Sequence, residues 1–206
     1  MRRVPVVATT VVALAVALMI ALGVWQLQRR AEKEAALVQL AANVSRPAIA
    51  FPDPPVGDAN LFRKATATCA RVLAWRTQSG RSAGGTPGWR HIAQCAGTPG
   101  AIVQFGVARD PKTRPIFAGG AVSGYLTHAP TGRSLLTDAF SPAAKPLMLV
   151  ADRPLPGLEA NPGPDLSAVP NNHLAYAVQW FLFAGIAVVV YAVALRRRGV
   201  DRQDQP

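Results

Sequence analysis

The chain has 206 residues, with 22 Lys and Arg against 11 Asp and Glu and a formal net charge of +11. This charge does not indicate nucleic-acid binding, because the 15 basic and 9 acidic residues in the range 30–165 form no dense Lys/Arg run and are not interleaved with aromatic residues. A basic outer face towards anionic lipid or an acidic partner fits the pattern better. Half of the residues are hydrophobic and they are unevenly distributed, which is typical of a chain with membrane-spanning segments.

Two apolar stretches are long enough to cross a bilayer core of about 30 Å. The first carries no charged residue from Val4 to Gln28, and the second carries none from Leu166 to Leu195. A cleaved signal peptide is the alternative for the first stretch. Its apolar run exceeds the usual length and continues into a helix-like sequence without a break, which argues against cleavage. We predict spans at 4–26 and 173–195.

Basic residues close to the spans set their orientation. Arg2 and Arg3 precede the first span, and a basic tail at 196–206 follows the second, whereas the segment 154–195 contains no Lys or Arg. Both termini are therefore expected in the cytoplasm. The central domain is expected on the periplasmic side of a bacterial inner (cytoplasmic) membrane.

The region between the spans changes its periodicity twice. Residues 27–62 form a helical extension followed by a Pro-rich connector, and from residue 63 the apolar residues alternate with a period of two. Short strands separated by Gly, Pro and Asp indicate a small antiparallel β-rich domain over 63–156, either barrel-like or a sandwich. A second Pro-rich connector covers 157–172. The predicted strands lie in the segments 64–75, 88–97, 100–110, 118–128 and 145–154.

Only two cysteines occur, Cys69 and Cys95, and both lie in the domain assigned to the oxidising side. We expect them to form a structural disulfide between neighbouring strands. Two free thiols and a metal pair are the alternatives, but a metal pair usually has closer spacing or additional His and Met ligands.

No sequence signature of an enzyme is present: the chain has no G-x-S-x-G, H-E-x-x-H, Walker A or dinucleotide-binding motif. The Gly-rich segment 79–85 is not followed by a helix signal and reads as a hairpin tip. His91 lies in an alternating strand and His128 at a strand end, and both are interpreted as structural or surface residues. We expect a protein that is not an enzyme.

Two motifs lie at those ends of the two spans that adjoin the central domain. The sequence GVWQLQRRAEK, residues 23–33, closes the first span, and VPNNHLAYAVQWFLFA, residues 169–184, opens the second. Together they resemble the surfeit locus protein 1 family, membrane proteins that assist the assembly of haem-copper cytochrome c oxidase. The family's motifs are matched by Gly23, Trp25, Gln26, Leu27, Arg29, Lys33, Asn171, Asn172, His173, Leu174, Tyr176, Ala177 and Trp180.

The resemblance implies an assembly factor that binds haem a or hands it over while oxidase subunit I matures. It also implies subunit I, other oxidase assembly factors and haem a synthase as partners. A membrane scaffold that stabilises the nascent subunit without touching cofactor is the alternative. A copper or thiol-redox protein of the outer space is a third, weaker option.

Physical arguments support roles for several motif residues. Trp25, Tyr176 and Trp180 lie near the expected bilayer surface, where amphipathic rings are favoured, and plain interfacial anchoring is their alternative role. The amide of Gln26 needs a polar partner at that depth, and the facing helix near Asn172 or His173 can supply one.

An ionisable residue at the edge of a span is a candidate functional residue, and neutral imidazole is a common axial ligand of haem iron. The resemblance implies that His173 is this ligand. The alternative is a histidine at a helix start that Asn171 or Asn172 caps. With haem bound, we expect Leu174, Ala177 and Val178 to contact the macrocycle, Trp25, Tyr176 and Trp180 to stack at its rim, and Arg29, Arg30 and Lys33 to meet the propionates.

Overall fold

The computed structural model describes residues 5–132, 137, 140, 143–167 and 171–200. The chain divides into two compact units. One comprises Met1–Ala36 with Val169–Pro206, and the other is Leu37–Ala168.

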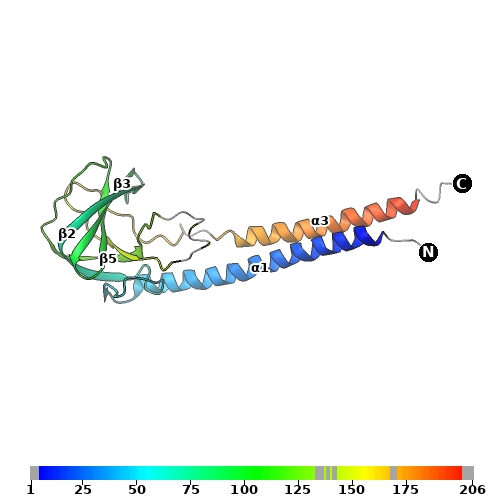
Figure 1. Cartoon of the computed structure of the whole chain (residues 1–206), viewed down its shortest axis with the longest axis horizontal. Helices are drawn as coiled ribbons and strands as arrows, with labels where there is room; N and C mark the ends of the chain where they lie inside the picture. The colour runs from blue at the N-terminus through cyan, green and yellow to red at the C-terminus, as the bar shows by residue number, and fades with distance from the viewer. Residues whose placement is uncertain (1–4, 133–136, 138–139, 141–142, 168–170, 201–206) are drawn as a thin grey trace. The chain divides into compact units, whose positions relative to one another are not determined.

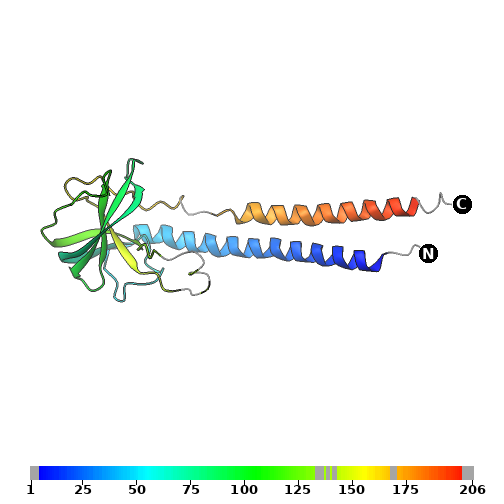
Figure 2. The ribbon, with the colours of Figure 1, turned by 45° about the horizontal axis from the view of Figure 1, so that its top comes forward.

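The first unit is a pair of helices that run side by side in opposite directions (Figures 1 and 2). Helix α1 spans Val6–Ser45 and helix α3 spans His173–Val200. Both are long and apolar enough to cross a membrane, and only 6% of the most hydrophobic window of each is buried. Nearly all of this apolar surface is therefore left for lipid or for other membrane helices to cover.

A narrow stripe on each helix makes the contact between them. The less exposed positions recur at alternating steps of three and four residues, the spacing of a left-handed helix pair. At the amino-terminal end of α1 the hydroxyl oxygens of Thr9 and Tyr191 lie 2.5 Å apart. The stripe consists of Thr9, Val12, Val16, Met19, Gly23 and Gln26 on α1, and of His173, Ala177, Trp180, Ala184, Ala187 and Tyr191 on α3.

Helix α1 continues well beyond its apolar part, as the sequence pattern predicts, and ends at Ser45. The chain cannot continue as a helix because Pro47 follows, and the residue before a proline is disfavoured in the α conformation. Asn43 is fully buried near this end and donates hydrogen bonds from Nδ2 to the carbonyl oxygens of Ala59 and Leu61 at 2.8 and 3.0 Å. The last turn of α1 is thereby tied to the connector that follows it.

The second unit contains a six-stranded sheet that closes on itself. The strands are β1 (Ile49–Ala50), β2 (Lys64–Arg81), β3 (Pro87–Gly97), β4 (Ile102–Ala108), β5 (Gly120–His128) and β6 (Leu147–Ala151). The order is β1-β2-β3-β4-β6-β5, and β2 also pairs with β5. The long strand β2 closes the ring because its first half pairs with β5 and its second half with β3. The barrel-like prediction is confirmed, and all five predicted strands are present.

The prediction of a purely antiparallel sheet is wrong. β4 pairs with β6 in parallel, and the short strand β1, which the sequence pattern did not reveal, pairs in parallel with β2. The parallel pair arises because β5 inserts between β2 and β6, so that β6 returns beside β4 in the same direction. Alternation within a strand specifies which face is buried but not which strand lies next to it.

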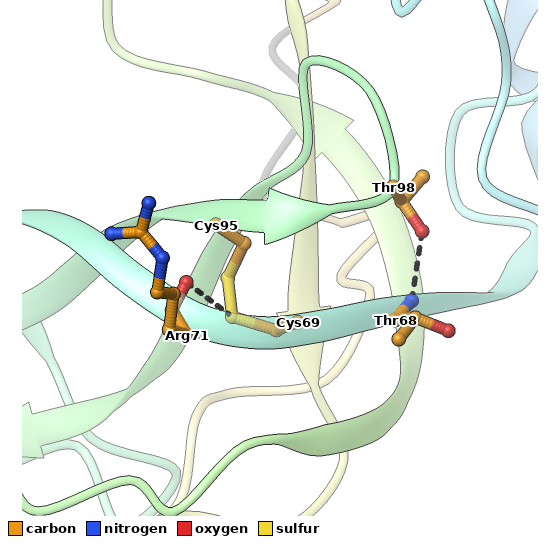
Figure 3. Close-up of a disulfide and its surroundings, with 5 residues drawn as sticks. All are labelled: Thr68, Cys69, Arg71, Cys95 and Thr98. Carbon is orange, nitrogen blue, oxygen red and sulfur yellow. Dashed lines mark hydrogen bonds between the residues drawn. A yellow bond between two sulfur atoms is a disulfide. The ribbon is translucent and has the colours of Figure 1, made fainter.

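The ring encloses a hydrophobic core to which Phe105, Leu126, Leu147 and Leu149 contribute side chains that are at most 1% exposed. Cys69 and Cys95 form a disulfide that links β2 to β3 beside this core (Figure 3). The predicted disulfide between neighbouring strands is confirmed. The free-thiol and metal-pair alternatives are therefore wrong for this oxidised chain.

A polar network fastens the return segment after β6 to the sheet. Asn161 donates from Nδ2 to the carbonyl oxygens of Gln104 and Ala151, and its Oδ1 accepts from Gln104 Nε2 at 2.7 Å. Nearby, Tyr125 donates its hydroxyl to the carbonyl oxygen of Pro162 at 2.6 Å. Burial raises the pKa of Tyr125 to about 12. The Pro-rich connector is thus anchored to the sheet before it leads back towards α3.

Candidate functional site

Gln26 of α1 and His173 of α3 face each other across the helix pair. His173 Nδ1 lies 2.8 Å from Gln26 Oε1. The two residues come from opposite ends of the sequence and from different motifs. The expectation that the Gln26 amide finds its partner near Asn172 or His173 is confirmed.

This contact fixes which ring nitrogen of His173 carries the proton. Gln26 Oε1 is a carbonyl oxygen and accepts, so Nδ1 of the neutral imidazole must donate. The lone pair then resides on Nε2. Among the described residues, the ring of His173 makes its hydrogen bond through Nδ1 and none through Nε2. A histidine held in this way, with one nitrogen donating to a carbonyl and the other free, has the arrangement commonly found in metal-ligating histidines.

Small residues allow the helices to approach closely enough for this bond. Gly23 lies one turn from Gln26 on the same face, and a Cβ atom placed on it would stand 2.6 Å from the Phe181 ring. Ala177, one turn beyond His173, is 1% exposed. The motif that contains Gly23 did not reveal the packing role of this residue. The signal that indicates this role is the preference for small residues where helices pack closely in membranes.

The aromatic residues of the motifs divide into two groups. Trp25 and Tyr176 are 48% and 52% exposed, so their rings are free to meet lipid or a ligand. Trp180 is half-buried and packs edge-on against Phe183, with ring centroids 6.2 Å apart. Ala177 is buried against α1 and cannot contact a macrocycle, so that expectation is wrong. Leu174 and Val178 are exposed, as a contact with a ligand requires.

The three basic residues expected near propionates differ in placement. Arg29 lies over the Trp25 ring at 5.9 Å and pairs with Glu32, while Arg30 pairs with Glu34 at 2.7 Å. Arg30 and Lys33 lie four and seven residues beyond Gln26, which places them on the same helix face at about 6 and 10 Å along the axis. Both ion pairs are largely exposed and are easily exchanged for another anion. Arg30 and Lys33 are thus better aligned with His173 than Arg29 is.

The two other histidines lie in the β domain. His91 is 1% exposed in β3, where burial lowers its pKa below the usual value and the nearby Arg114 lowers it further. His128 at the end of β5 pairs with Asp58, Nε2 to Oδ1, at 2.8 Å. Both match the structural and surface roles expected for them. No group of three or more His, Cys, Asp or Glu residues gathers as a metal site in the part of the chain that the structure describes.

The start of α3 also bears on the capping alternative. The helix begins at His173, and the carbonyl oxygen of Asn172 accepts from the backbone N–H of Tyr176 at 3.3 Å. Asn172 therefore occupies the N-cap position through its backbone. This does not engage the His173 ring, so capping and ligand binding are compatible.

The comparison with known protein families agrees with this architecture. The SURF1 family model matches residues 13–185, which include most of α1, the first half of α3 with its motif, and all six strands. A search of curated proteins found no match. Since the match covers well over half of the sequence and includes both helix motifs, the chain belongs to the SURF1 family of cytochrome oxidase assembly factors.

Proposed function

We propose that this protein assists oxidase assembly by holding haem a at the outer end of its helix pair and releasing it to subunit I. The observation that supports this proposal is the bond between His173 Nδ1 and Gln26 Oε1, which leaves Nε2 available to iron. No catalytic group is required for such a role. The protein acts as a carrier, and haem is its cargo.

The residues around His173 fit a haem in three respects. The candidate nitrogen donor is an imidazole, a common axial ligand of haem iron. Exposed apolar and aromatic side chains flank it, among them Leu174, Tyr176 and Trp25. Basic side chains that can pair with carboxylates lie on the adjoining face of α1, where Arg30 and Lys33 follow Gln26.

A single protein ligand suits a carrier. One axial bond leaves the other axial position open and holds the iron less firmly than two bonds do. Gln26 strengthens the remaining bond, because a hydrogen bond from Nδ1 raises the basicity of Nε2. The strength of the iron bond is then set by an amide, which polarises the ring less than a carboxylate would.

We place the protein in a bacterial inner membrane with both termini cytoplasmic and the β domain periplasmic. The basic tails at either end of the chain and the disulfide of the β domain support this orientation. An alkaline-phosphatase fusion after Gly100 should be active and one after Gly199 inactive. The reverse pattern would refute the orientation.

The carrier proposal is tested by purifying the full chain from cells that make haem a and recording its visible spectrum. His173→Ala should lose or shift the haem bands, whereas the control variants His91→Ala and His128→Ala should keep them. Gln26→Ala should retain haem with shifted bands and weaker binding.

The scaffold alternative has its own support, since the exposed faces of both helices offer surface to a membrane subunit. If the His173→Ala variant keeps an unchanged spectrum and supports normal oxidase activity, the scaffold function replaces the carrier function.

A further inference from the structure

One edge of β2 is open over its second half. Residues 64–69 pair with β5 on that side, and the last pair is Cys69 with Gly120. Beyond Cys69 the other side of β2 pairs with β3 as far as Arg81. The pairing with β5 stops at Cys69. On that same side of β2, no backbone group of another described residue is hydrogen-bonded to residues 71–81. In an antiparallel pair about half of the backbone groups point away from the partner strand, so this segment presents a row of free donors and acceptors.

The open edge carries arginines at regular intervals. Arg71, Arg76 and Arg81 are all exposed. The bulge between Val72 and Ala74 in the pairing with β3 places Arg71 and Arg76 on one face and Arg81 on the other. No ion pair to Arg71 or Arg76 occurs in the described part of the chain. Leu73 on the same edge is 49% exposed.

The charge around the edge has one sign. From Leu61 to Gly132 the sequence has nine Lys or Arg residues and one acidic residue, Asp110. An isolated edge of this length is a template for an added strand, and the uniform positive charge selects what can pair with it.

We propose that residues 71–81 bind an extended, acidic segment of a partner protein, which adds to the sheet as a further strand beside β2. Backbone hydrogen bonds supply affinity in this mode of recognition, and side chains opposite the receiving strand supply specificity. Carboxylates spaced to face the three arginines meet them as direct cross-strand pairs, which stabilise a sheet. An apolar residue of the segment covers Leu73.

The charge of the edge argues against a second copy of this chain as the occupant. Residues 71–81 carry three arginines and no acidic residue, so two β2 edges that pair with each other bring six cations together in any register. Like charges directly opposite each other destabilise a sheet. The same three residues therefore keep copies of the chain apart and admit an acidic strand.

The test uses the full chain in detergent and a ten-residue peptide with Glu at its first, fifth, sixth and tenth positions and Thr or Val elsewhere. In the pairing with β3 the residues opposite the three arginines are spaced by four and by five, so this pattern faces all three arginines in either strand direction. Binding is followed by fluorescence anisotropy of the labelled peptide at low salt and by amide hydrogen exchange of the protein. We expect binding together with slower exchange across residues 71–81.

Three controls separate strand addition from general charge attraction. The triple variant Arg71→Glu, Arg76→Glu, Arg81→Glu should weaken binding at least about tenfold and should accept the peptide with Lys in place of Glu. The matched variant Lys112→Glu, Lys145→Glu, Arg153→Glu removes the same charge at exposed sites outside β2 and should stay within about twofold of the parent. A peptide N-methylated at alternate residues keeps its charge and should not bind.

Three results would overturn the proposal. The first is absence of binding at low salt. The second is equal weakening by both triple variants. The third is unchanged binding of the N-methylated peptide, which would mean that charge alone holds it.

Discussion

The substitution Gly23→Ala tests whether close packing of the helices sets the Gln26–His173 bond. The added Cβ would stand 2.6 Å from the Phe181 ring, where ordinary contact begins at 3.4 Å, so the ring or the helix must move by about 0.8 Å. If the helices separate by that amount, the bond of 2.8 Å lengthens to about 3.6 Å and is lost. Overpacking lowers the stability of the helix pair by about 1–3 kcal/mol, whereas replacing a glycine inside a helix by alanine raises it by about 1 kcal/mol.

The assay for this variant is a titration of the purified chain with sodium dodecyl sulfate, followed by tryptophan fluorescence, with haem loading measured in parallel. Gly185 serves as the control, because a Cβ placed there would meet nothing within 4 Å, and Gly185→Ala should not lower the midpoint. Phe181→Ala should remove most of the effect of Gly23→Ala. If Gly23→Ala alone leaves both midpoint and haem loading unchanged, the close contact does not position His173.

Three further outcomes follow from other parts of the structure. Replacing both Cys69 and Cys95 by Ala opens a loop with a sequence separation of 26 and should lower the stability of the β domain by about 3.5 kcal/mol. Circular dichroism should show a melting temperature lower by about 10 °C, while haem binding persists. Tyr191→Phe removes the bond to Thr9 and should cost about 0.6 kcal/mol in the detergent titration, with no additional cost in Thr9→Val, Tyr191→Phe. The pKa of Tyr125 is raised from 10 to about 12, so the folded state favours the neutral phenol. Its contribution to stability should be complete below pH 10 and lost as pH rises towards 12, as absorbance at alkaline pH and denaturant midpoints can show.

The sequence predicted most of the elements, because their signals are local. The two apolar helices, the five longer strands and the hairpin tip at 79–85 each follow from periodicity or turn residues within one short window. The disulfide followed from having two cysteines in one domain. The parallel β4–β6 pair and the open edge of β2 depend on which strands become neighbours, and no short window contains that information.

The candidate site was predictable for a different reason. Gln26 and His173 are polar residues in apolar surroundings, and each needs a partner that the other can provide. What the sequence did not reveal is the direction of the side chains around them. Ala177 was expected on the ligand side and is buried between the helices, and Arg30 shares the face of Gln26 more closely than Arg29 does.

The disulfide also bears on how the chain matures. With two cysteines in the sequence, only one intramolecular pairing exists, so the chain cannot form a scrambled isomer by itself. It needs an oxidant but no isomerase. Because the two sulfurs join strands that are consecutive in the chain, their oxidation requires only the β2–β3 hairpin and not the closed ring. The time at which the two thiols stop reacting with an alkylating reagent during synthesis therefore reports when that hairpin forms.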